Sequence, residues 1–209
     1  MTGVDRVIPD HHLAFEERLF HAVNVDGGRL VDRLALSLSS PWFGAAVGLS
    51  LAAALWAWRR ERRAQSVLAL AVALALSDGL GSQVLRPLLA RARPAYALPP
   101  GTVRWIAEAA DVGSIPSLHA SNFFAMAAVA SAAWPKLWPL FFGVASAVAW
   151  SRVYVGVHWP LDVLCGALWG GICAALALAS ARALAGRSRS PDEGVRRNAA
   201  RLPRGRASK

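Results

Sequence analysis

Residues 160–184 read PLDVLCGALWGGICAALALASARAL, and this stretch decides the fold class. It contains one acidic and one basic side chain, and it exceeds the roughly 20 residues that a helix needs to cross a bilayer. Working outward, four further apolar runs precede it, at about Pro41–Trp58, Ala64–Leu85, Pro116–Trp134 and Leu137–Trp150. The sequence therefore predicts an all-α, polytopic membrane helix bundle with about five transmembrane helices.

Composition and charge support a membrane protein. Of 209 residues, 55% are apolar and only 17% are charged, and the mean hydropathy is +0.36, whereas soluble chains carry about 25% charged residues. The net charge of +10 is compatible with nucleic-acid binding. However, the cations cluster at 59–63 and after Gly186, directly behind apolar runs, as cytoplasmic loops of membrane proteins do. The expected partner is the lipid bilayer and not a nucleic acid.

The chain divides into three segments. Residues 1–40 are too polar to cross and are expected to form interfacial amphipathic helices, with a sixth span in this region as the alternative. Residues 41–184 form the transmembrane domain, and 185–209 form a basic, disordered cytoplasmic tail. The Lys/Arg bias places 59–63, Lys136 and the tail inside, and loops 86–115 and 151–159 outside.

Small and polar residues within the spans indicate how the helices pack. The pairs Gly44/Gly48 and Gly166/Gly170 have the four-residue spacing that allows close approach of helices. Asp78 is costly in a span and must face the bundle or a polar cavity, where a packing contact is as good an explanation as a chemical role.

The first outer loop begins with RPLLARARP, residues 86–94. Arginines are depleted on the outer side of membrane proteins, so Arg86 and Arg93 indicate a bound anion, and their planar forks of donors suit phosphate. For Arg91 and Arg104, contact with lipid headgroups is the expected role.

The second element is SIPSLHA, residues 114–120, at the start of the third span. Pro116 suits a first helical turn, whose free amides would point at an anion, and Ser117 would add a hydroxyl donor. His119 then lies one turn into the helix. Alone, the element would be an ordinary capped helix with an interfacial histidine.

The third element is SRVYVGVHWPLD, residues 151–162. His158 and Asp162 are four residues apart across the start of the fifth span, where Pro160 fixes the first turn. This spacing lets the carboxylate bind one imidazole nitrogen and leaves the other free as a nucleophile. Arg152 supplies another donor for phosphate.

Together the three elements resemble the type-2 phosphatidic acid phosphatase superfamily. Its pattern is Lys, six residues, Arg-Pro; then Pro-Ser-Gly-His; then Ser-Arg, five residues, His, three residues, Asp. The order and spacing agree, with two departures: Arg86 replaces Lys and keeps the charge, and Leu118 replaces Gly and keeps the backbone donor.

The resemblance implies hydrolysis of a phosphate ester without metal or other cofactor, through a phosphohistidine. His158 would be the nucleophile, Asp162 would orient it, and His119 would act as general acid and then as general base. The phosphate-binding residues implied are Arg86, Arg93, Ser117, Leu118 and Arg152.

The resemblance also implies an amphiphilic substrate in a bacterial cytoplasmic (inner) membrane, with the active site facing the periplasm. Undecaprenyl diphosphate is the favoured substrate, and phosphatidylglycerophosphate, phosphatidic acid and lipid A are the alternatives. A phosphotransferase that passes the phosphoryl group to another lipid, and a non-catalytic lipid-binding protein, are further alternatives. The five spans argue against a haloperoxidase, and the sequence indicates no oligomeric state.

Overall fold

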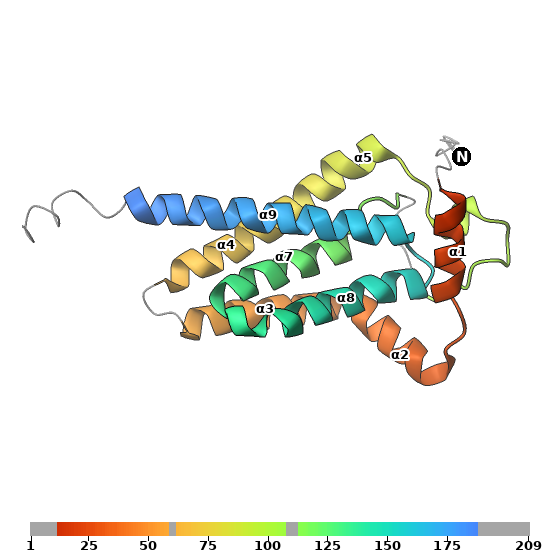
Figure 1. Ribbon diagram of the computed structural model, residues 1–209, viewed down its shortest axis with the longest axis horizontal. Helices are drawn as coiled ribbons and strands as arrows, with labels where there is room; N and C mark the ends of the chain where they lie inside the picture. The colour runs from red at the N-terminus through yellow and green to blue at the C-terminus, as the bar shows by residue number, and fades with distance from the viewer. Residues whose placement is uncertain (1–11, 59–61, 108–112, 188–209) are drawn as a thin grey trace, which may run out of the picture.

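The structure, a computed structural model, describes residues 12–58, 62–107 and 113–187 (Figure 1). In these ranges all regular structure is helical, apart from an isolated bridge between Ala92 and Gly113. The predicted all-α class is confirmed. Most of the predicted disordered tail lies outside the described residues.

Two helices precede the bundle, α1 (Ala14–Val23) and α2 (Gly28–Ser39), where amphipathic segments were expected. Figure 1 shows α1 lying across one end of the bundle, roughly perpendicular to its long helices. Phe20 is fully buried there and packs with Leu98, Val153 and Trp159. Burial of such a side chain contributes about 1.5–3 kcal/mol, so α1 is bound to the end of the bundle. The position of both helices in a membrane interface stays a prediction.

Five long helical segments occupy the predicted spans. They are α3 (Pro41–Trp58), α4 (Arg63–Ala75) with its continuations η1 (Leu76–Leu85) and α5 (Arg86–Leu89), α7 (Leu118–Ala133), α8 (Trp138–Tyr154) and α9 (Pro160–Arg187). The short elements α6 (Pro94–Ala97) and η2 (Pro135–Leu137) lie in connections. Within the described ranges, α3, the segment Arg63–Leu89 and α9 are long and apolar enough to cross a membrane, whereas α7 is shorter. The count of five crossings therefore stays a prediction.

The central helix is α7, which packs against α3, α4, α8 and α9. A Cβ added at Gly166 would overlap the carbonyl oxygen of Ser117, and one at Gly170 would overlap that of Ser121. The absence of these side chains lets α9 lie directly on α7, which confirms the close packing predicted for this pair. At Gly44 and Gly48 the nearest atoms of α7 lie at 3.5 and 3.6 Å, which is ordinary contact.

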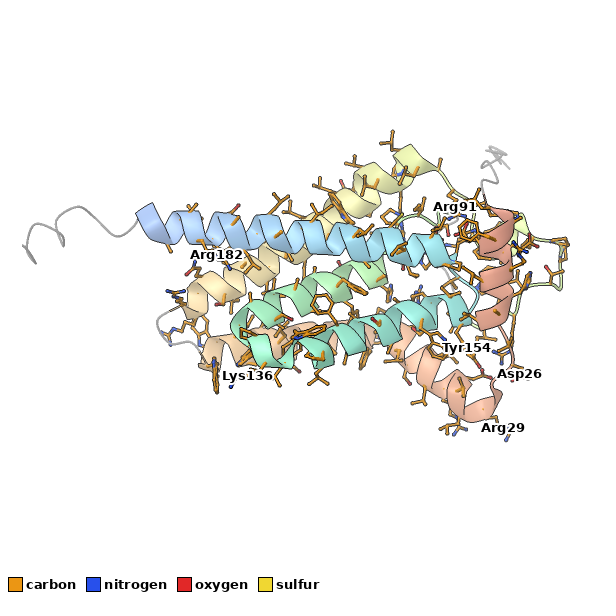
Figure 2. All side chains as sticks on the ribbon, viewed as in Figure 1. Asp26, Arg29, Arg91, Lys136, Tyr154 and Arg182 are labelled. Atoms are coloured by element: carbon orange, nitrogen blue, oxygen red, sulfur yellow. The ribbon has the colours of Figure 1, made fainter. Side chains whose placement is uncertain are left out.

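The two ends of the bundle differ in their side chains. Figure 2 shows Lys136 and Arg182 at one end and Arg91 and Tyr154 at the other, beside α1. The three motif segments meet at the second end, because α7 and α9 both begin there and α8 ends there. The fold thus brings residues 86–94, 114–120 and 151–162 together.

Candidate active site

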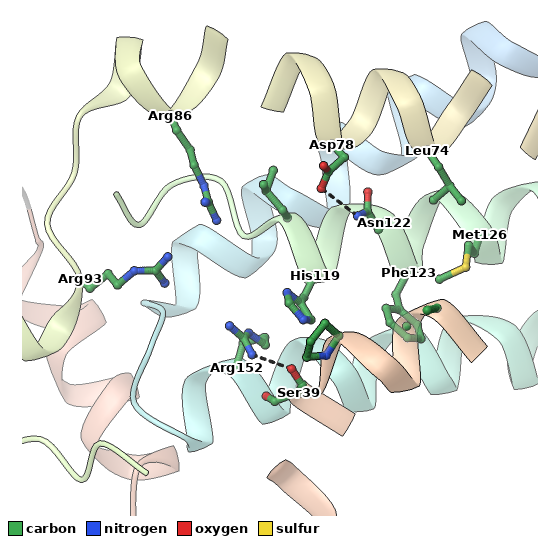
Figure 3. A pocket seen from close by; sticks show the side chains of 14 residues that line it. Ser39, Leu74, Asp78, Arg86, Arg93, His119, Asn122, Phe123, Met126 and Arg152 are labelled. Carbon is green, nitrogen blue, oxygen red and sulfur yellow. Dashed lines mark hydrogen bonds between the residues drawn. The ribbon is translucent and has the colours of Figure 1, made fainter. Parts of the chain in front are cut away.

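A cavity of about 560 Å³ lies between α3, η1, α7 and the end of α8 (Figure 3). Five of the eight predicted site residues line it, namely Arg86, Arg93, Leu118, His119 and Arg152. The other three, Ser117, His158 and Asp162, are buried and are not among the lining residues. The predicted residues therefore form a wall of the cavity and a layer behind it.

Three arginines from different elements converge on the cavity (Figure 3). Arg86 begins α5, and its Nε donates to the Pro116 carbonyl at 3.4 Å. Arg152, near the end of α8, donates through Nη1 to the Ser39 carbonyl at 3.1 Å, while its buried Nε has no partner among the described residues. Arg93 precedes α6 and donates through Nη1 to the Val157 carbonyl at 2.7 Å. Backbone carbonyls therefore hold the guanidinium groups in place before any anion arrives.

His158 lies behind Arg93 and is 1% exposed. Its Nε2 is 3.2 Å from Nη1 of Arg93, and its Nδ1 is 3.4 Å from Oδ2 of Asp162. Arg93 has only donors to offer, so this geometry assigns the ring proton to Nδ1 and the lone pair to Nε2. Burial, followed by the charges of Arg93, Arg152 and Arg86, lowers the pKa of His158 well below its ordinary value. The ring is therefore neutral at physiological pH, as a nucleophile must be.

Asp162 is fully buried and held on every side. Its Oδ2 accepts hydrogen bonds from the Ser114 hydroxyl and, at 2.8 Å, from the Trp159 amide, and its Oδ1 accepts from Arg91 at 2.9 Å. Pro160 begins α9 as predicted, so Asp162 lies in the first turn, where the helix dipole favours a carboxylate. The carboxylate cannot turn away from His158 without breaking several bonds.

Arg91 is not a headgroup contact, and that prediction was wrong. It is 5% exposed and binds Glu16 through two hydrogen bonds, Nη1–Oε1 at 3.1 Å and Nη2–Oε2 at 2.5 Å, besides its bond to Asp162. Its guanidinium also lies over the Trp159 ring. Neither Glu16 nor Ser114 was selected as a site residue from the sequence. A single carboxylate on the apolar side of the amphipathic α1 was the available signal for Glu16.

Arg104 also differs from its predicted role. Its Nη2 lies 2.6 Å from Oδ2 of Asp32 and its guanidinium lies over the Tyr154 ring. The hydrogen bond from Arg104 lowers the pKa of the Asp32 carboxyl. The side-chain amide nitrogen of Asn24 donates to the carbonyls of Arg104 and Tyr154, and its oxygen accepts from the backbone amide of Arg104. This cluster joins the α1–α2 turn to the outer loop, away from the cavity.

The start of α7 lies two residues later than predicted. The helix begins at Leu118, so Pro116 precedes it and does not lie in the first turn. The Ser117 amide donates to the Asp162 carbonyl at 3.0 Å, which directs this donor away from the cavity and fixes α7 to α9. The Ser117 hydroxyl is buried without a partner among the described residues. Leu118 and His119 supply the first-turn amides beside the three arginines, where an anion is favoured.

The opposite wall of the cavity is formed by η1 and α7. Asp78 lines it, as expected for a carboxylate within a span, and accepts a hydrogen bond from Asn122 at 3.2 Å. The Ser77 hydroxyl bonds Asn122 at 2.7 Å and lies 2.5 Å from that of Ser121. The segment η1 is π-helical, a rare conformation that is frequent at functional sites. Leu74, Phe123 and Met126 complete the cavity with apolar surface.

Groups of three or more side chains of the metal-ligating types His, Cys, Asp and Glu do not occur in the described ranges. The cationic groups at the cavity are instead the three guanidinium groups. Guanidinium groups suit a phosphate by their charge and their planar donors, and the neutral His158 lies behind Arg93 with His119 on the wall.

Known proteins resemble this chain in sequence and in fold. Residues 66–184 match the sequence profile of the PAP2 superfamily, which is more than half of the chain. The crystal structure of Aquifex aeolicus LpxE superposes with a TM-score of 0.68 at 28% identity, covering 80% of this chain and 96% of that chain.

Two curated relatives match in sequence. YbjG of Escherichia coli strain K12, named as a candidate undecaprenyl-diphosphatase, is 49% identical over 61 residues, which are 28% of this chain and 30% of that protein. A lipid A 4′-phosphatase of Bacteroides thetaiotaomicron is 33% identical over 100 residues, 46% of this chain and 44% of that protein. The matches thus span less than half the length of these relatives.

Proposed function

The chain belongs to the PAP2 superfamily, and from this we propose that it is a lipid phosphatase, which hydrolyses the terminal phosphate of a membrane lipid phosphate or diphosphate. The observation that carries the proposal is the setting of His158, whose Nε2 faces Arg93 at the cavity and whose Nδ1 faces Asp162. An imidazole oriented in this way is an activated nucleophile, and His119 lines the same cavity.

The reaction takes two steps. The lone pair on Nε2 of His158 attacks phosphorus, the Nε2–P bond forms and the bond from phosphorus to the leaving oxygen breaks. The leaving oxygen takes the electron pair and a proton from His119. In the second step His119 removes a proton from water, whose oxygen attacks phosphorus and returns the electron pair to Nε2. Substrate must first displace Nη1 of Arg93 from Nε2, which turns Arg93 into a phosphate ligand.

The phosphate is held by Arg86, Arg93 and Arg152, with the amide of Leu118 and the hydroxyl of Ser117 as further donors. Within the described part of the chain the buried Nε of Arg152 and Oγ of Ser117 have no partner, which supports this assignment, because buried donors are usually bonded. Three fixed guanidinium groups stabilise the charge that develops on the phosphoryl oxygens, so the proposed reaction needs no metal.

An amphiphilic substrate fits the shape of the cavity. Its cationic part continues into apolar surface at Phe123 and Met126, and both residues also line a second, almost wholly apolar cavity of about 610 Å³ between α3, α7 and α8. A phosphate can bind the arginines while the lipid chain stays among the helices. Undecaprenyl diphosphate is the proposed substrate, and the similarity to YbjG supports it.

Phosphate monoesters of lipids are the second candidate substrates. The longer match to a lipid A 4′-phosphatase favours lipid A, and phosphatidylglycerophosphate and phosphatidic acid belong to the same class. Transfer of the phosphoryl group to a lipid hydroxyl in place of water uses the same phosphohistidine. Product analysis with and without an acceptor lipid separates the two reactions.

We also propose a location. The apolar helices make the chain a membrane protein, and the Lys/Arg distribution supports a multi-pass protein of the bacterial inner membrane with the cavity toward the periplasm.

The test uses the full chain, purified in detergent. Phosphate release is measured on a panel of lipid phosphates and diphosphates, and acid-labile phosphate on the protein is trapped by rapid quenching. The proposal expects release from at least one lipid, and trapped phosphate that is lost in His158→Ala. His21→Ala is the matched control, because the His21 side chain on α1 is partly exposed and does not line the cavity. Trapped phosphate in His158→Ala would overturn the assignment.

A further inference from the structure

Glu16 is a fully buried carboxylate on α1, and it lies outside the residues 66–184 that match the family. Both of its oxygens bind Arg91, and Oε1 also accepts a hydrogen bond from the Leu161 amide at 3.0 Å. Burial of a carboxylate is costly, and here charge-assisted bonds satisfy it. The placement is therefore specific, and it joins α1 to the first turn of α9.

The partner of Glu16 is shared with the proposed active site. Arg91 binds Glu16 and, through the same Nη1, Oδ1 of Asp162 at 2.9 Å. Asp162 in turn faces Nδ1 of His158. The charges along this row are −1 on Glu16, +1 on Arg91 and −1 on Asp162, so the row as a whole carries −1. Without the charge on Glu16, the charges of Arg91 and Asp162 would cancel each other.

The charge matters because the surroundings of His158 are otherwise cationic. Arg93, Arg152 and Arg86 all act on His158, from the outer loop, α8 and the start of α5, and His119 acts on it from α7. The other groups bound to Asp162 are the neutral Ser114 hydroxyl and Trp159 amide. The Cys165 thiol on α9 is a further titratable neighbour of the Glu16–Arg91–Asp162 row.

We propose that Glu16 is a positioning residue for His158. Glu16 binds Arg91, and Arg91 in turn keeps the Asp162 carboxylate in place. The negative charge of Glu16 also offsets the positive charge of Arg91, so that the charge of Asp162 still acts on His158. This rests on the proposed function, in which Nε2 forms a bond to phosphorus while Nδ1 keeps its proton. The ring changes from neutral to cationic in that step, and the leaving oxygen takes the electron pair of the broken bond. A net negative charge at Asp162 stabilises the cationic ring, whereas a neutralised pair would not.

Glu16→Gln separates the effect of charge from that of side-chain shape. The amide oxygen of the variant can still accept from the Leu161 amide and from Nη1 of Arg91, whereas its NH2 group replaces the oxygen that accepted from Nη2, so the charge and one hydrogen bond are lost while the shape is kept. Glu17→Gln is the matched control, because Glu17 is the next residue on α1, is partly exposed and faces His12 and His21. Glu16→Asp keeps the charge on a shorter side chain.

The first measurement is kinetic, on the full chain in detergent with the best lipid of the phosphate-release panel. Glu16→Gln is expected to lower kcat about 10–100-fold, the usual effect of an outer partner of a reactive group. KM should stay within about twofold, since the phosphate ligands are intact. Glu16→Asp should recover part of the loss, and Glu17→Gln should behave as wild type. A raised KM at unchanged kcat, or an equal loss in Glu17→Gln, would overturn the proposal.

The second measurement does not depend on activity. The proton on Nδ1 of His158 is identified in a histidine-labelled protein by NMR, as the resonance that is lost in His158→Asn. In Glu16→Gln this resonance should move upfield, because the charge of Arg91 then cancels that of Asp162 and the carboxylate accepts a weaker hydrogen bond. In Glu17→Gln the resonance should not move. An unmoved resonance in Glu16→Gln overturns the coupling, even in an active enzyme. If the resonance shifts in a protein that releases no phosphate, the proposed function is wrong, but the coupling of Glu16 to His158 is supported.

Discussion

Replacement of Gly166 by alanine is expected to separate α9 from α7 at the level of the candidate active site. The new Cβ would overlap the Ser117 carbonyl oxygen and would lie 3.2 Å from the Cβ of Ala120. A backbone oxygen cannot move aside unless the chain that carries it moves, so α7 and α9 must move apart. Overpacking of this kind costs about 1–3 kcal/mol. Alanine otherwise gains about 0.5–1 kcal/mol over glycine within a helix.

Gly171 provides the matched control on the same helix, because a Cβ there meets no atom within 4 Å. Gly171→Ala gains helix propensity alone, so the difference in free energy of unfolding between the two variants isolates the packing cost. That difference is expected to be about 1–3 kcal/mol. Unfolding in mixed micelles by titration with SDS, followed by circular dichroism, measures it.

The same variant should lose turnover, because the contact lies beside the reacting groups. Ser117 precedes α7, which carries His119, and its amide bonds the Asp162 carbonyl at 3.0 Å. A displacement of about 1 Å between catalytic groups costs about 10²-fold in rate. The kcat of Gly166→Ala should fall by this order, and that of Gly171→Ala should not. Equal stability and equal turnover in the two variants would refute the view that helix spacing sets the geometry of the site.

Labelling with a membrane-impermeant thiol reagent in intact cells tests the orientation, in a protein whose two native cysteines are replaced. Pro100→Cys should react and Lys136→Cys should not, and both positions are exposed. The reverse pattern would overturn the orientation. Phosphate release should persist in excess EDTA and be blocked by vanadate, since guanidinium groups hold the phosphate; loss in EDTA that Mg²⁺ restores would contradict this. His119→Ala should lower turnover of a lipid phosphate about 10²–10⁴-fold, and less for nitrophenyl phosphate, whose leaving group needs no proton. An equal loss on both substrates would argue against a general acid. The free energy of unfolding should fall as the pH drops below about 6.5, because the pKa of buried His158 is lowered and the ring takes up a proton only on unfolding. The fall should be smaller in His158→Asn, and identical slopes would disprove the assignment.

Hydropathy and local spacing predicted the helices and the meeting of the three motifs. Apolar runs marked the long helices within a few residues, since length and hydropathy determine them. The pair His158 and Asp162 also followed from sequence, because four residues across a helix start fix their relation. The start of α7 was missed by two residues, because the Ser117 amide bonds Asp162 on another helix.

The ion pairs could not be predicted in the same way. Glu16 lies 75 residues from Arg91, and Asp32 lies 72 from Arg104, so no local spacing relates the partners. Both arginines lie in an outer loop whose path depends on where α1 and α2 pack. Hydropathy also could not predict the π-helical segment η1, because η1 lies within the apolar run and does not interrupt it.

Helix α9 has 28 residues, and at 1.5 Å per residue it measures about 42 Å, more than the roughly 30 Å of a hydrocarbon core. Its first turn is fixed, since Glu16 binds the Leu161 amide and the Asp162 carbonyl binds Ser117. Near its far end the Ala181 carbonyl accepts a hydrogen bond from Gln65 of α4, so α9 cannot tilt alone, and a bilayer of different thickness must be matched by tilt of the bundle as a whole. Arg182 lies in that far part, where a long cationic side chain can reach the headgroups at several depths. Tilt of the whole bundle does not change the contacts between its helices, so membranes of unequal thickness should leave the site geometry unchanged.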